Sequence, residues 1–168
     1  MWLFKTGLFI ENAIKKLSWL MNKVGAYVLL LLMILTAVDV TGRFFFSKPF
    51  RGTFELTELA LVLIVLFALG HALLEGRHIS IDTVVNRLSA GSRAKVETFV
   101  YFVSAIVFAL VVWEMCRHAN NLKVAGAVTG VLSLPIYVFV LLGALGALVF
   151  MLLFLLYFLK SLKGVCGK

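Results

Sequence analysis

Four long apolar stretches constrain the fold of this chain more than any other feature. They cover residues 24–46, 54–74, 96–116 and 131–159. A helix that crosses a hydrocarbon core of about 30 Å needs about 17–25 mainly apolar residues, and every stretch is long enough. The stretches lack the in-out alternation of barrel strands, and a backbone in lipid must satisfy its own hydrogen bonds. The sequence therefore predicts an all-α integral membrane protein with four transmembrane helices.

The composition agrees with this prediction. Hydrophobic residues make up 62% of the 168 positions, whereas a soluble domain contains about 45–50%. The chain shows no internal repeat, and no linker is long enough to separate domains. We therefore expect residues 1–168 to form one membrane domain.

The basic residues are distributed unevenly around the four stretches. The chain has 16 Lys and Arg residues and a net charge of +8. Eleven of the 16 lie before the first stretch, between the second and third, or after the fourth. Because basic residues accumulate on the cytoplasmic side, both termini are predicted to be cytoplasmic. The net charge thus reports orientation and lipid contact, and it does not indicate nucleic-acid binding.

Two segments outside the spans have helical patterns of their own. In residues 1–23, apolar residues share one helical face and lysines share another, which predicts an amphipathic helix in the cytoplasmic interface. Between the second and third spans, Ser80 is a plausible N-cap and Asp82 falls in the first turn. The apolar positions that follow have helical spacing, so a short cytoplasmic surface helix is predicted there.

Charged residues inside and beside the first two spans are the main candidates for a functional site. Asp39 and Arg43 are four positions apart and therefore share one helical face. Glu55 and Glu58 lie near the start of the second span, on the same side of the membrane, within expected reach of Arg43. We predict that these four residues form an ion-pair cluster that fixes how the first two spans meet. The alternative is that they line a cation or proton pathway.

The sequence offers little for catalysis or cofactor binding. His71 and His78 are on the cytoplasmic side and His118 is on the other, so no pair can bracket one haem iron. Phosphate loops, zinc-ligand clusters and nucleophile-base signatures are also lacking. We therefore expect no enzymatic activity, no metal site and no cofactor on this chain.

A set of short motifs resembles a known family, the small membrane subunit (DctQ-like) of tripartite ATP-independent periplasmic (TRAP) transporters. The first group surrounds the start of the second span, and the second group follows that span. The matching residues are Arg43, Phe44, Pro49, Gly52, Thr53, Glu55, Leu56 and Glu58, then Gly76, His78, Ile79 and Asp82, and finally Leu134 and Pro135. One departure is Phe54, where many relatives carry a tryptophan.

The resemblance implies a subunit of the bacterial inner membrane that pairs with a large membrane subunit and works with a periplasmic binding protein. Such systems import organic acids, including dicarboxylates, sialic acid and other sugar acids, and are driven by sodium. The large subunit holds the substrate and sodium sites, while the small one is a fixed scaffold, so no substrate-binding residue is expected here. On this view Arg43, Glu55 and Glu58 orient the scaffold. The loop with Gly76, His78 and Asp82 would brace its cytoplasmic side.

Two alternatives from other classes have distinct requirements. A self-sufficient four-helix exporter would place an essential carboxylate near the middle of the membrane, and Asp39 is the approximate candidate. A membrane anchor of a redox complex would need cofactor ligands. Transport by the chain alone would support the first, and a visible haem spectrum would support the second.

Overall fold

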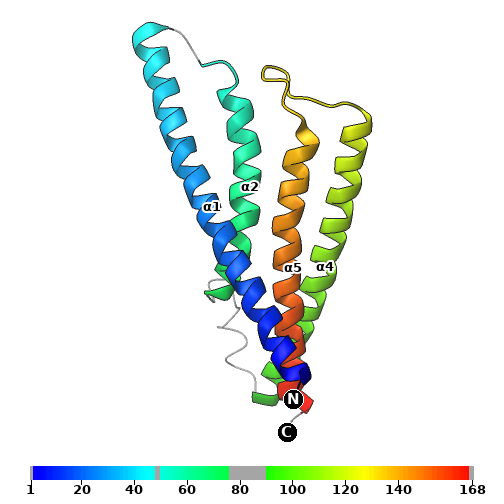
Figure 1. Ribbon diagram of the computed structural model, residues 1–168. Helices are drawn as coiled ribbons and strands as arrows, with labels where there is room; N and C mark the ends of the chain where they lie inside the picture. The colour runs from blue at the N-terminus through cyan, green and yellow to red at the C-terminus, as the bar shows by residue number, and fades with distance from the viewer. Residues whose placement is uncertain (1, 48–49, 76–89, 167–168) are drawn as a thin grey trace.

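The structure is a computed structural model that describes residues 2–47, 50–75 and 90–166. It contains four long helices (Figure 1), α1 (Trp2–Phe46), α2 (Thr53–Leu74), α4 (Ala90–Val124) and α5 (Ile136–Cys166). Each of them includes a stretch that is long and apolar enough to cross a membrane. Over these described ranges, the prediction of a helical fold with four helices able to span a membrane is confirmed.

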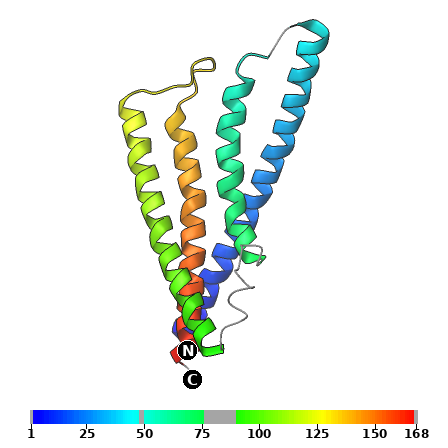
Figure 2. The same cartoon turned by 180° about the vertical axis from the view of Figure 1, so that it is seen from behind.

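The helices form two antiparallel pairs. The closest packing is between α4 and α5, followed by α1 with α2, and contacts of α5 with α2 and α1 join the pairs. The α4–α5 loop and the junction of α1 with α2 lie at one end of the bundle, here called the loop end (Figure 1). Both termini lie at the opposite end, here called the terminal end. The view from behind shows that the pairs spread apart towards the loop end (Figure 2).

Helix α5 supplies most of the core. Phe150, Leu153 and Phe154 are almost completely buried. They pack with Leu73 of α2 and Ala105 of α4. Apolar side chains from three helices therefore fill this core, where van der Waals packing is the main attraction between helices in lipid.

Glycine lets α2 and α5 approach each other closely. A Cβ atom at Gly146 would lie 3.0 Å from both the carbonyl carbon and the carbonyl oxygen of Leu66. At this distance a side chain on α5 would press on the backbone of α2, which has little room to move. Small residues at helix contacts are typical of membrane bundles for this reason.

The N-terminal part of the chain differs from the prediction. We expected an interfacial helix over residues 1–23 and a separate span over residues 24–46, but α1 runs without interruption through Trp2–Phe46. The described part of α1 contains no proline, so the backbone hydrogen bonds continue across the change from amphipathic to apolar sequence. The boundary at residue 23 is a change in side-chain polarity and not a helix end. The interfacial location stays a prediction.

The other helix ends also depart from the apolar limits. Helix α4 extends beyond the predicted 96–116 at both ends, and α5 starts at Ile136, five positions after the predicted start. Residues 131–135 belong instead to the α4–α5 loop, and Pro135 stands directly before the first helical residue. The predicted surface helix between the second and third spans lies outside the described residues.

Candidate functional site

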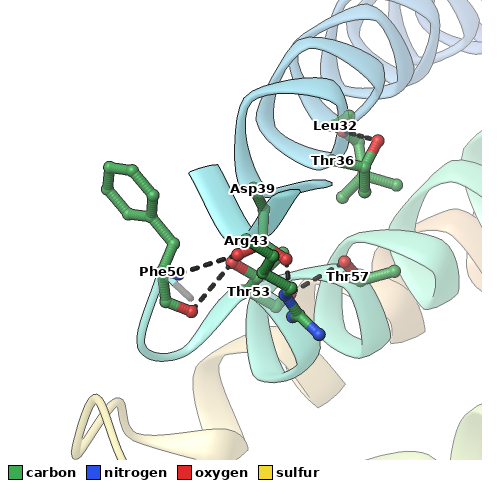
Figure 3. Close-up of polar contacts among 7 residues, drawn as sticks. All are labelled: Leu32, Thr36, Asp39, Arg43, Phe50, Thr53 and Thr57. Atoms are coloured by element: carbon green, nitrogen blue, oxygen red, sulfur yellow. Dashed lines mark hydrogen bonds and ion pairs between the residues drawn. The ribbon is translucent and has the colours of Figure 1, made fainter. Parts of the chain in front are cut away.

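A buried carboxylate joins α1 to the start of α2. Asp39 is only 4% exposed. Its Oδ2 atom accepts a hydrogen bond from Nη2 of Arg43 at 2.6 Å, and its Oδ1 atom accepts one from the backbone N–H of Phe50 at 2.7 Å (Figure 3). The Thr53 hydroxyl donates to the Phe50 carbonyl at 3.2 Å. We call Asp39, Arg43, Phe50 and Thr53 the Asp39 clamp, because it fixes where the chain turns from one span into the next.

The position of Arg43 explains how a charge pair is tolerated here. Its side chain is 41% exposed, whereas that of Asp39 is 5% exposed. The guanidinium group also lies over the ring of Phe54, 5.3 Å from the ring centre. The cation therefore lies partly outside the bundle, while the carboxylate stays inside with both oxygens hydrogen-bonded.

A second carboxylate fastens the loop between α4 and α5. Oε1 of Glu55 accepts a hydrogen bond from the backbone N–H of Val131 at 2.6 Å, and Oε2 accepts one from the backbone N–H of Leu132 at 3.0 Å. Glu55 lies in the first turn of α2, so one side chain connects the two helix pairs at the loop end. We call Glu55, Val131 and Leu132 the Glu55 clamp.

The loop itself is folded to meet this carboxylate. Residues 128 and 135 form an isolated antiparallel bridge, and the Thr129 hydroxyl accepts a hydrogen bond from the backbone N–H of Leu134 at 3.0 Å. Leu132 also packs on Gly52, where an added Cβ would lie 2.6 Å from its Cγ. Gly52 has a φ of +89°, so glycine is favoured there for its backbone as well as for space.

The four residues of the predicted ion-pair cluster divide between two networks. Asp39 and Arg43 form the expected pair, but the Glu55 carboxylate binds loop backbone and not Arg43. Glu58 is exposed, and no ion pair joins it to another residue of the described ranges. The role of the set in orienting a scaffold stays a prediction. The cytoplasmic loop motif, which comprises Gly76, His78 and Asp82, lies outside the described residues.

A third polar network closes the terminal end, and sequence reasoning missed it. The Oε1 atom of Glu11 accepts hydrogen bonds from the ammonium groups of Lys15 at 2.6 Å and Lys160 at 2.5 Å. The first partner follows the i, i+4 rule, but Lys160 is 149 positions away on α5. Nothing in the sequence marks that second contact, which ties the first helix to the last.

The acidic side chains of these networks accept hydrogen bonds from backbone amides and from basic side chains. Each carboxylate oxygen of Asp39 and Glu55 accepts a hydrogen bond from the protein. Within the described ranges, no three His, Cys, Asp or Glu side chains are grouped so that they could hold a metal ion. At the loop end, the Asp39 and Glu55 carboxylates accept hydrogen bonds from the backbone of two loops.

With four helices that are long and apolar enough to cross a membrane, the described residues define a helical, multi-span membrane protein. The sequence family described as "Tripartite ATP-independent periplasmic transporters, DctQ component" matches residues 32–164, and the chain belongs to this family. It is 26% identical over 139 residues to the ectoine TRAP transporter small permease protein TeaB of Halomonas elongata. The aligned residues make up 81% of this chain and 70% of TeaB. No solved structure matches the chain.

Family membership confirms the resemblance seen in the sequence. The chain is a small permease subunit of a TRAP transporter and a membrane protein, and the family is one of transporter subunits and not of enzymes. In TRAP systems, members of this family work with a large membrane subunit and a binding protein.

The Glu55 clamp leads to a prediction about loop stability. Glu55→Gln should accelerate amide hydrogen exchange in residues 129–135 by roughly tenfold, because an amide side chain offers one acceptor oxygen in place of two charged ones. Exchange measured by mass spectrometry on the detergent-purified chain checks this. Glu58→Gln removes the same charge from an exposed position on the same helix and should leave loop exchange unchanged. Equal rates of loop amide exchange in Glu55→Gln and Glu58→Gln would contradict the role of Glu55 in holding the loop.

Proposed function

We propose that this chain is the fixed scaffold subunit of a sodium-driven TRAP importer for organic acids, such as dicarboxylates, sialic acid or other sugar acids. It pairs with a large membrane subunit, which carries the substrate and sodium sites, and the complex receives substrate from a periplasmic binding protein. The complex lies in the bacterial inner membrane. TeaB belongs to an ectoine transporter, so ectoine is a further substrate to test.

The hydrogen bonding of the Asp39 carboxylate is the observation that carries this proposal. A carboxylate in an ion or proton pathway has to contact the transported ion, and hydrogen bonds from the protein compete with that contact. Both Asp39 oxygens are bonded to the protein, one to Arg43 and one to the Phe50 backbone. Asp39 is also the residue that a self-sufficient exporter would have to use. The hydrogen bonds of Asp39 to Arg43 and Phe50 therefore favour a scaffold role for this residue over a role in a transport pathway.

The arrangement of the termini supports the proposed orientation. Both termini lie at the same end of the bundle, as an even number of spans requires (Figure 1). The cytoplasmic assignment follows from the excess of Lys and Arg in the segments at that end. In this orientation the Asp39 and Glu55 clamps face the periplasm, the side from which a binding protein delivers substrate.

Purification from the native host tests the proposal directly. In mild detergent, the chain should elute together with a larger polytopic protein, which mass spectrometry of the eluate identifies. Liposomes that contain only this chain should not take up organic acids or ectoine, whereas liposomes that contain the complex and its binding protein should do so when sodium is supplied. Recovery of the chain only as a homodimer, or uptake by the chain alone, would overturn the proposal.

A further inference from the structure

A groove lies between α4 and α5 near the terminal end. It has a volume of about 330 Å³ and is lined by Lys95, Thr98, Phe99, Phe102, Phe158 and Leu162. The four α4 residues follow the i, i+3, i+4, i+7 pattern of one helical face, and the two α5 residues are four positions apart. The groove is therefore a regular feature of two facing helix surfaces.

Contacts beside the groove hold its two walls together. The rings of Phe102 and Phe158 lie 5.2 Å apart between centroids. The hydroxyls of Thr98 and Ser161 are hydrogen-bonded at 2.5 Å. These contacts join α4 to α5 across a lining that is almost entirely apolar. The groove suits a hydrocarbon chain, which needs no hydrogen bond from its walls.

One cationic side chain stands at this apolar surface. Lys95 is exposed, and no carboxylate of the described residues forms an ion pair with it. Glu97 is two positions further on, about 200° around the helix, and it does not line the groove. Lys160, at the end of α5, is already paired with Glu11. Among the described residues, the positive charge of Lys95 therefore faces the apolar groove without a carboxylate partner.

The position of Lys95 relative to the apolar part of α4 indicates the kind of ligand. It stands directly before the apolar stretch of residues 96–116. A lysine at this level places its ammonium group among lipid headgroups, with apolar residues beneath it at the level of the acyl chains. A cation above an apolar groove is complementary to an anionic phospholipid, which carries its phosphate above its hydrocarbon chains.

We propose that this groove binds one anionic phospholipid, with an acyl chain along Phe99, Phe102 and Phe158 and the phosphate on Lys95. The lining residues come from two helices of this chain, α4 and α5. It does not depend on the proposed transport function. A lipid bound there would contact both α4 and α5 and fill the groove between them.

Native mass spectrometry of the full chain in mild detergent tests this proposal. The chain is titrated with phosphatidylglycerol or with phosphatidylcholine that has the same acyl chains. The wild type should retain phosphatidylglycerol preferentially. Lys95→Gln should weaken that binding about fivefold, the change that corresponds to about 1 kcal/mol for one cationic side chain at an anionic surface, and should leave phosphatidylcholine binding unchanged.

Two further variants separate the site from general effects of charge and folding. Lys123→Gln removes a lysine from an exposed position at the other end of α4 and should bind phosphatidylglycerol like the wild type. Lys95→Arg keeps the charge and should retain binding. Equal binding of phosphatidylglycerol by the wild type and Lys95→Gln, or equal affinity for the two lipids, would overturn the proposal. A photo-reactive amino acid at position 99 gives a further test in native membranes. Cross-linking to another protein, and not to lipid, would also overturn the proposal.

Discussion

Asp39→Ala is expected to lower the melting temperature of the detergent-purified chain by roughly 5 °C or more. The substitution removes the acceptor of two short hydrogen bonds, one from Arg43 at 2.6 Å and one from the Phe50 backbone at 2.7 Å. It leaves a cation and a backbone N–H without their partner at the junction of α1 and α2. Because the clamp fixes that junction, the variant should also reduce the amount of assembled transporter complex.

The control for this prediction is a second ion pair of similar spacing. Glu114 and Arg117 are separated by 3.8 Å on α4, and both side chains are about two-thirds exposed. Exposed pairs of this kind contribute little, so Glu114→Ala should hardly change the melting temperature. If Asp39 served ion transport, its replacement would instead change the sodium dependence of uptake by the complex that still assembles. That result, with a normal melting temperature and normal assembly, would contradict the structural role.

Gly146→Ala is expected to destabilise the bundle by about 1–3 kcal/mol, the usual cost of overpacking. The added methyl group would lie 3.0 Å from the carbonyl carbon and oxygen of Leu66. A flexible side chain could rotate away, but a helix backbone can only shift as a whole. The variant should therefore force α2 and α5 apart, and thermal unfolding in detergent measures the loss.

Gly25→Ala is a matched control because it makes the same change at another helix contact. A Cβ atom at Gly25 would meet its nearest neighbour, the Cβ of Phe67, at an ordinary van der Waals distance of 3.5 Å. Alanine also costs less backbone entropy than glycine in a helix. We expect this variant to melt at or slightly above the wild-type temperature. If the Gly146→Ala and Gly25→Ala variants had the same melting temperature, the inference that α2 and α5 pack too closely for a side chain at Gly146 would be wrong.

The four spans could be predicted because lipid imposes a strong and simple requirement on sequence. Hydropathy locates the part of each helix that lipid can surround, but it does not mark where backbone hydrogen bonding stops. Helix α4 therefore continues through the polar turn that ends at Val124, beyond the predicted limit at residue 116. In contrast, α5 starts later than predicted. Residues 131–135 are mainly apolar and were therefore assigned to the span, but they belong to the folded loop that ends at Pro135.

The candidate site was predictable only where its contacts are local. The pairing of Asp39 with Arg43 follows from a spacing of four in one helix. Glu55 was recognised as a candidate, but its partners are backbone amides 76 and 77 positions away, and a backbone amide has no sequence signature. The contact of Glu11 with Lys160 is equally remote in sequence. Such contacts depend on how the helices pack, which hydropathy does not encode.

The length of α1 has a consequence for the shape of the protein in the membrane. An uninterrupted helix of 45 residues is about 68 Å long, whereas a bilayer with its headgroups is about 40–45 Å thick. Transmembrane helices tilt by up to about 40°, and at that angle the helix still rises about 52 Å. A straight α1 is therefore longer than the bilayer is thick, and the salt bridge from Glu11 to Lys160 ties its N-terminal part to α5.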